Sequence, residues 1–176
     1  MWSRVTFTKT ILALIADRHA RRPAHNSILL DALFRRLARC AKTEATETED
    51  RIWDVWMDHP HGAAARALEA ATRDIAARRY DIAETRLALL LRRAPGFAEA
   101  WHKRATLYYL LGRDDECLGD IRRTLELEPR HFAAMLHFAE ILLGLDAAPD
   151  ARFAFRAALS LHPHLPRARQ ALSDNP

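Results

Sequence analysis

Residues 98–129 read AEAWHKRATLYYLLGRDDECLGDIRRTLELEP, two amphipathic stretches separated by a short turn. Apolar side chains recur at spacings of three and four in both stretches, as on the buried face of a helix. Gly112 can take up the left-handed conformation that ends a helix, Asp114 is expected to cap the next one, and Pro129 cannot continue it. The segment therefore predicts a hairpin of two helices. Its buried stripes are Trp101, Ala105, Tyr108 and Leu111 in the first helix and Cys117, Ile121, Thr124 and Leu125 in the second.

The same pattern recurs at a fixed interval of 34 residues, which separates Pro95 from Pro129 and Pro129 from Pro163. Two short helices cannot bury their apolar stripes alone, so each hairpin is expected to stack on the next and form one elongated core. The sequence thus predicts three stacked helical hairpins over residues 62–165. The further columns in register are Ala71, Ala105 and Ala139; Ala83, Cys117 and Ala151; Leu87, Ile121 and Phe155; and Leu91, Leu125 and Leu159.

Residues 98–129 resemble one complete repeat of the tetratricopeptide-repeat (TPR) family. The chain departs from the family pattern at Arg104, where the family usually has Leu, and at Cys117 and Thr124, where it usually has Ala. The resemblance covers residues 64–165 and implies an all-α solenoid with a non-catalytic role as an adaptor or scaffold. It does not identify a partner, because members of the family bind many unrelated proteins. The residues on signature columns are Trp101, Ala105, Tyr108, Gly112, Ile121 and Pro129.

The resemblance also implies a groove, lined by the first helix of each hairpin, that binds a peptide or protein segment. Chaperone-binding members grip a terminal carboxylate with Lys, Asn and Arg, whereas this chain has Leu68, Thr72, Leu136 and Glu140 at the matching places, with Lys103 as the one basic residue nearby. An extended or helical segment with apolar anchors would fit better, with Tyr109 as the main contact. The alternative is a structural groove partly filled by the N-terminal arm. The expected groove residues are Leu68, Thr72, Ile75, His102, Thr106, Tyr109, Leu136, Glu140 and Leu143.

The flanking segments do not follow the 34-residue register. Residues 28–61 predict a pair of helices that covers the first hairpin, and residues 166–176 predict a short capping helix and a tail. Three large side chains of the pair, Trp53, Trp56 and Met57, are expected in the core, with an exposed contact patch as the alternative.

Residues 1–27 form a basic arm, because residues 1–42 carry nine basic and two acidic side chains. Residues 1–22 resemble a poor export or organellar targeting segment. The alternatives are an amphipathic arm docked on the helical body, or a disordered basic tail. The second candidate function follows from this segment: a helical accessory protein that the arm attaches to an anionic surface, either membrane or RNA. A cytoplasmic location is expected, and an exported or organellar one if residues 1–22 act as a targeting segment.

Composition and motifs exclude several other classes. The chain has 176 residues and a net charge of +4, and residues 59–176 carry 17 basic and 15 acidic groups, a balance that argues against a nucleic-acid-binding surface. No apolar run is long enough to cross a membrane. Phosphate-binding loops and nucleophile motifs are absent, so neither an enzyme nor a cofactor is expected.

Two histidine pairs, His59/His61 and His162/His164, could in principle share a metal ion. Each pair flanks a proline at a helix end, and neither has a cysteine or carboxylate at a suitable spacing. We therefore expect loop residues and no metal. Cys40 and Cys117 lie within helical patterns and are interpreted as small apolar fillers.

Overall fold

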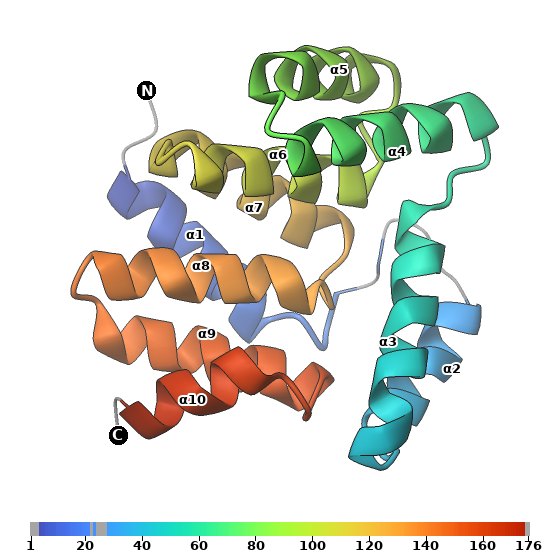
Figure 1. Ribbon diagram of the computed structural model, residues 1–176. Coiled ribbons are helices and arrows are strands. Elements are labelled where there is room, and N and C mark those ends of the chain that lie inside the picture. The colour runs from blue at the N-terminus through green and yellow to red at the C-terminus, as the bar shows by residue number, and fades with distance from the viewer. Residues whose placement is uncertain (1–3, 22, 24–27, 175–176) are drawn as a thin grey trace.

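The computed structural model describes residues 4–21, 23 and 28–174, and these residues form helices and no strand. The predicted all-α class and the three helical hairpins are confirmed, and Figure 1 shows the hairpins stacked in order along the chain. Within this described part, no helix combines the length and the apolar content needed to cross a membrane. The hairpins are α4 (Gly62–Ala76) with α5 (Tyr80–Arg93), α6 (Ala98–Leu110) with α7 (Asp114–Leu127), and α8 (Phe132–Gly144) with α9 (Ala148–Leu161), followed by α10 (Pro166–Asp174).

The turns inside the hairpins repeat one backbone geometry. Arg78, Gly112 and Asp146 lie 34 residues apart, and all three have a positive φ, of 56°, 67° and 57°. This left-handed residue reverses the chain after the first helix of each hairpin. The predicted cap by Asp114 is wrong, because Arg113 occupies the N-cap position and makes no capping hydrogen bond through its side chain. Asp114 instead lies in the first turn, where its charge suits the helix dipole.

Small residues allow the hairpins to approach closely. Ala71, Ala105 and Ala139 occupy equivalent positions in α4, α6 and α8, and each is fully buried. A bulky side chain at such a position has no space and forces its neighbours into strained rotamers.

We predict that Ala105→Trp lowers the free energy of unfolding by about 1–3 kcal/mol, because it overpacks the α6 contact. Ala76→Trp is the matched control, since Ala76 is an exposed alanine at the end of α4 and its replacement should change stability by less than about 0.5 kcal/mol. Urea unfolding of both variants measures the difference. Equal stabilities would contradict the assigned packing of the repeats.

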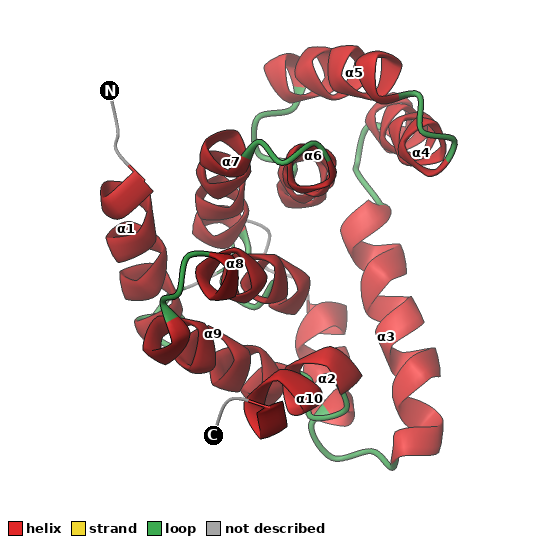
Figure 2. Cartoon of the chain, turned by 60° about the vertical axis from the view of Figure 1, so that its left-hand side comes forward, coloured by secondary structure: helices red, strands yellow, loops and turns green. Residues whose placement is uncertain are grey.

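The N-terminal arm forms α1 (Arg4–Ala16), which packs along the outer side of α7 and α9. Figure 2 shows it on the side of the stack away from α3. Ile11 and Ile15 of α1 are fully buried. Basic groups of the arm contact the body: Arg4 pairs with Asp115 at 2.7 Å, Arg18 donates to the hydroxyl of Ser160 at 2.9 Å, and Arg21 donates to the carbonyl oxygen of Glu126 at 3.2 Å. Of the three interpretations of the arm, the described residues adopt the docked form; residues 1–3, 22 and 24–27 lie outside the description.

The predicted helical pair is α2 (Ile28–Leu37) and α3 (Lys42–Met57), and it lies on the opposite side of the stack from α1 (Figure 2). The pair was expected to pack over the first hairpin, but most of its large side chains pack elsewhere. Trp53 packs edge-on against Phe132 of α8 at 6.0 Å, and Trp56 lies 5.2 Å from the same ring. Of the three large side chains, Met57 is the one that joins the apolar cluster of the first hairpin. The expected core role of the tryptophans holds, with Trp56 only 6% exposed.

Candidate functional site

The candidate site is the inner face of the stack, formed by α4, α6 and α8. Figure 2 shows these three helices on the side toward α3, with α5, α7 and α9 outside them. The nine expected groove residues lie on these three helices in equivalent columns. Leu68 and His102 are buried, with 0% and 3% exposure, so they offer no surface to a partner in this conformation. The seven that stay partly accessible are Thr72, Ile75, Thr106, Tyr109, Leu136, Glu140 and Leu143.

The part of the inner face beyond α3 centres on Tyr109. The ring of Tyr109 stacks on His137 of α8, with 5.4 Å between centroids and 14° between planes. Burial raises the pKa of Tyr109, and the nearby carboxylate of Glu140 raises it further. Glu140 Oε1 also pairs with Arg167 of α10 at 2.7 Å, while its buried Oε2 atom has no hydrogen-bond partner among the described residues. This surface therefore combines an aromatic platform with a hydrogen-bond acceptor.

A hollow of about 240 Å³ extends this surface between α8, α9 and α10. Its lining mixes apolar and charged side chains, with Leu143 and Phe155 beside Arg167 and Asp174. A mixed lining of this kind can hold an apolar anchor and orient it by hydrogen bonds.

A buried polar cluster lies under α3, next to this surface. The carboxylate of Glu99, 1% exposed, accepts from Nε2–H of His131 at 2.8 Å, from Nδ1–H of His102 at 3.3 Å and from the ammonium of Lys103 at 3.0 Å. Burial alone would raise the pKa of Glu99, but these donors outweigh it and hold the pKa well below its usual range. Burial lowers the pKa of His102 to about 3, against the opposing effect of Glu99, and lowers that of His137 to about 4.

Aromatic rings of α3 cover this cluster. Trp56 stacks on His131 with 4.1 Å between centroids and 9° between planes, and Trp53 lies 5.9 Å from the ring of His102. The ammonium of Lys103 sits 4.8 Å from the centre of the Trp53 ring, within the range of a cation–π contact. The helical pair is therefore fixed to the inner face through the polar cluster as well as through Phe132.

The polar cluster is the one group of potential metal ligands found among the described residues. Glu99, His102 and His131 each offer a ligand atom, and these atoms lie within 4.8 Å of one another. Two contacts oppose a metal ion. The Nδ1 atom of His131 accepts from the backbone N–H of Ala134 at 3.3 Å, so the proton must be on Nε2, and Lys103 already neutralises Glu99. The arrangement fits a hydrogen-bonded network better than a metal site.

Glu99 and His131 were not predicted as functional residues, although the repeat register contains a signal for them. Glu99 stands in the column of Ala65 and Ala133, and His102 in that of Leu68 and Leu136. His131 stands in a third apolar column, with Ala63, Phe97 and Leu165. Three apolar columns are thus each broken by a polar residue where the second and third hairpins meet.

The two histidine pairs considered at first serve the ends of helices. In each pair, the first imidazole accepts from a backbone N–H two residues later, at 3.1 Å for His59 and 3.3 Å for His162. His162 also contacts Glu49 at 3.0 Å and thereby ties α3 to the third hairpin. These contacts agree with the loop interpretation.

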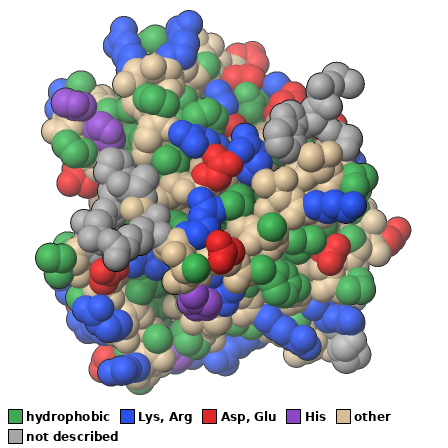
Figure 3. Space-filling view, turned by 180° about the vertical axis from the view of Figure 1, so that it is seen from behind, with side chains coloured by type: hydrophobic (Ala, Val, Ile, Leu, Met, Phe, Trp, Pro, Cys, Tyr) green, Lys and Arg blue, Asp and Glu red, His purple; other side chains and the backbone are tan. Residues whose placement is uncertain are grey.

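Charge is dispersed on the face of the molecule that Figure 3 presents. Lys and Arg side chains there alternate with Asp and Glu and do not gather into one basic patch. Such mixing is typical of an ordinary solvated surface, whereas nucleic-acid binding uses a concentrated basic face.

The chain is similar to a TPR repeat-containing protein of Rhizobium etli, with 32% identity over 114 residues. The match covers 64% of this chain and 56% of the relative, so the chain spans about half the relative's length. No family model matches the chain. The similarity and the stacked hairpins together confirm the predicted resemblance to TPR proteins and the TPR-like solenoid, and they indicate a protein-interaction module in general.

Proposed function

We propose that this TPR-like chain is a non-catalytic adaptor or assembly factor that holds a segment of a partner protein against the α6 and α8 part of the inner face and against the neighbouring α10. The observation that carries the proposal is the accessible surface around Tyr109, where an aromatic stack, the acceptor Glu140 and a hollow of about 240 Å³ adjoin. The Glu140 carboxylate, whose side chain is 11% exposed beside Arg167, favours a segment that brings an N–H or O–H donor. Leu143 and Phe155 favour an apolar anchor beside that donor.

Helix α3 covers part of the inner face, so a partner can bind only to the part around Tyr109. Trp53, Trp56 and the polar cluster occupy the region near the start of α6, so a partner segment would lie toward the ends of α6 and α8 and along α10. Tyr109 remains the most plausible hot spot, because tyrosine supplies a large rigid contact and a polar tip.

We predict that Tyr109→Ala weakens partner capture by about 30-fold, the effect of losing a hot spot worth about 2 kcal/mol. Phe153→Ala is the matched control, since Phe153 is a 40% exposed aromatic on α9, outside the inner face. Purified wild-type and variant proteins would be compared by affinity capture from the native organism, followed by binding measurements with the recovered partner. Equal affinities of the two variants, with unchanged helical circular dichroism, would refute the site.

Attachment to an anionic surface by the basic arm receives less support. Arg4, Arg18 and Arg21 contact the body, and the buried Ile11 and Ile15 mean that removal of the arm would also disturb the core. Intact protein should therefore be tested on vesicles containing phosphatidylserine. Tight binding that Tyr109→Ala leaves unchanged, together with unchanged partner capture, would favour surface attachment over the inner face.

A further inference from the structure

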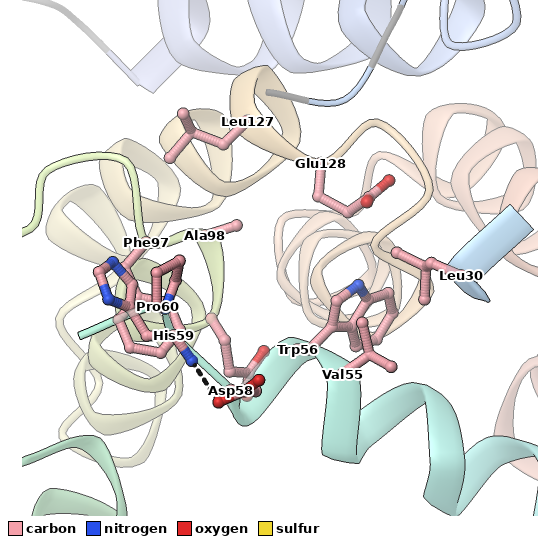
Figure 4. A pocket seen from close by; sticks show the side chains of 11 residues that line it. Leu30, Val55, Trp56, Asp58, His59, Pro60, Phe97, Ala98, Leu127 and Glu128 are labelled. Atoms are coloured by element: carbon pink, nitrogen blue, oxygen red, sulfur yellow. Dashed lines mark hydrogen bonds between the residues drawn. The ribbon is translucent and has the colours of Figure 1, made fainter. Parts of the chain in front are cut away.

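A separate cavity of about 260 Å³ lies between the α2–α3 pair and the second hairpin. It is bounded by the end of α3, the start of α6 and the end of α7 (Figure 4). Its apolar walls include Leu30, Trp56, Phe97 and Leu127. Asp58 and Pro60 at its edge are exposed, so a solute can enter from that side.

The charges around this cavity are predominantly negative. Asp58, Glu99 and Glu128 line it, and among the described residues no Lys or Arg does. Glu128 is paired with Arg130, which also pairs with Asp31, and Glu99 is paired with Lys103. Counting the lining groups and their direct partners gives four carboxylates against two cations, a net charge of −2 with the histidines neutral.

The backbone adds to this field. Asp58 and Glu128 are the C-cap residues of α3 and α7, so the negative ends of two helix dipoles point toward the cavity. The start of α6 contributes one positive helix end, and Glu99 lies in that first turn and offsets it. The cavity therefore favours a cation over an anion.

One polar atom in the wall lacks a partner. Trp56 is 6% exposed, and its indole Nε1–H has no hydrogen-bond partner among the described residues. Figure 4 shows this nitrogen on the edge of the ring that faces the cavity, toward Glu128. This N–H is a donor and gives a cation no acceptor, so it does not contribute to the preference for positive charge; because it borders the cavity, its resonance reports on what fills the cavity.

We infer that this cavity binds a small organic cation, a guanidinium or ammonium group on a short apolar chain. The charged head would lie between Asp58 and Glu128, each of which retains acceptor capacity, and the chain would lie against Leu30, Phe97 and Leu127. The volume lies just below the usual range of ligand pockets, which suits a ligand the size of one arginine or lysine side chain. The cation could be a free metabolite or a basic side chain of a bound protein. The site is independent of the surface around Tyr109.

The test is titration of the full chain with butylguanidinium and with butylurea, its neutral near-isostere, read by the Trp56 indole N–H resonance. Trp56→Phe assigns that resonance. We expect butylguanidinium to shift it, with a dissociation constant about tenfold or more below that of butylurea. Asp58→Asn should weaken butylguanidinium binding by a similar factor and leave thermal stability unchanged. Tyr109→Ala should leave the titration unaltered.

A second pair of probes separates the two sources of the cation. A short blocked peptide with one arginine is compared with the same peptide carrying citrulline. A Trp56 shift with the arginine peptide assigns the cavity to a protein segment, and a shift with free butylguanidinium only assigns it to a metabolite. Equal binding of butylurea and butylguanidinium, or no shift with any probe at tens of millimolar, would overturn the inference.

Discussion

Replacing Arg104 with Phe is expected to lower the free energy of unfolding by about 3–5 kcal/mol at pH 7, the cost of stranding a buried charge. Arg104 Nε and Nη2 donate to the two carboxylate oxygens of Asp120 at 2.7 and 2.8 Å, and Asp120 is 5% exposed. Burial already raises the pKa of Asp120 in spite of the opposing effect of Arg104. Without the guanidinium, the carboxylate would remain desolvated and without its bidentate partner.

The third hairpin supplies the matched control. Its residues at the same columns are Phe138 and Ala154, both fully buried, so the double variant Arg104→Phe/Asp120→Ala reproduces a pair that this fold already accommodates. We expect the double variant to unfold within about 1 kcal/mol of the wild type, since exchanging a buried ion pair for apolar groups is often neutral or stabilising. Urea unfolding of both single variants and the double variant measures the coupling.

The pH dependence of Arg104→Phe provides a second readout. A stranded Asp120 has a folded-state pKa above its unfolded value, so the folded state binds the extra proton and the penalty disappears as the pH falls. The stability difference from the wild type should therefore shrink below about pH 5. A double variant as unstable as the sum of the single variants would show that Arg104 and Asp120 act independently.

Local sequence pattern predicted the repeats because their contacts are short in sequence. The turn at Gly112 and the alanine column through Ala105 depend on the hairpin that contains them and on its neighbours. The 34-residue interval and the residue types are therefore enough to place the turn and the alanine column, and the structure has both where they were predicted.

The placement of the flanking helices depends on contacts that no local pattern records. Arg4 meets Asp115 across 111 residues of sequence, and Glu49 meets His162 across 113. The amphipathic pattern of residues 28–57 predicts that α2 and α3 bury one face, but it does not say against which hairpin. Trp53 and Trp56 were accordingly assigned to the core, but against the first hairpin, whereas they pack on Phe132 of the third.

The candidate site was partly predictable for the same reason. Tyr109 and Glu140 follow from the resemblance to TPR repeats, which assigns their columns to the inner face. His102 is buried because α3 lies over it, and α3 is not part of the 34-residue repeats. Glu99 and His131 were recognisable only as polar residues in apolar columns, and their meeting under Trp56 is a three-dimensional result.

Acid should destabilise the protein well above the pH at which carboxylates titrate, and His102 should account for about half of the effect. The pKa of buried His102 is about 3 and that of His137 about 4, against 6.5 for an ordinary histidine. Between pH 6.5 and 4.5 the unfolded chain therefore binds protons at these two residues that the folded chain does not. Stability is complete above about pH 6.5 and falls as the pH drops, by up to about 1.4 kcal/mol per pH unit for each histidine.

His102→Leu tests this assignment, because Leu68 and Leu136 occupy the same column in the other two hairpins. Glu99 keeps His131 and Lys103 as donors in this variant, so the polar cluster retains two of its three contacts. Urea unfolding at intervals from pH 7 to 4.5 should show a loss of about 4 kcal/mol for the wild type and about half that loss for the variant. Thr106→Ala, one turn further along the same face, removes no titratable group and should keep the wild-type slope. Identical slopes for His102→Leu and the wild type would mean that His102 takes up its proton in the folded state as readily as in the unfolded chain, and that the cluster beneath α3 opens to water.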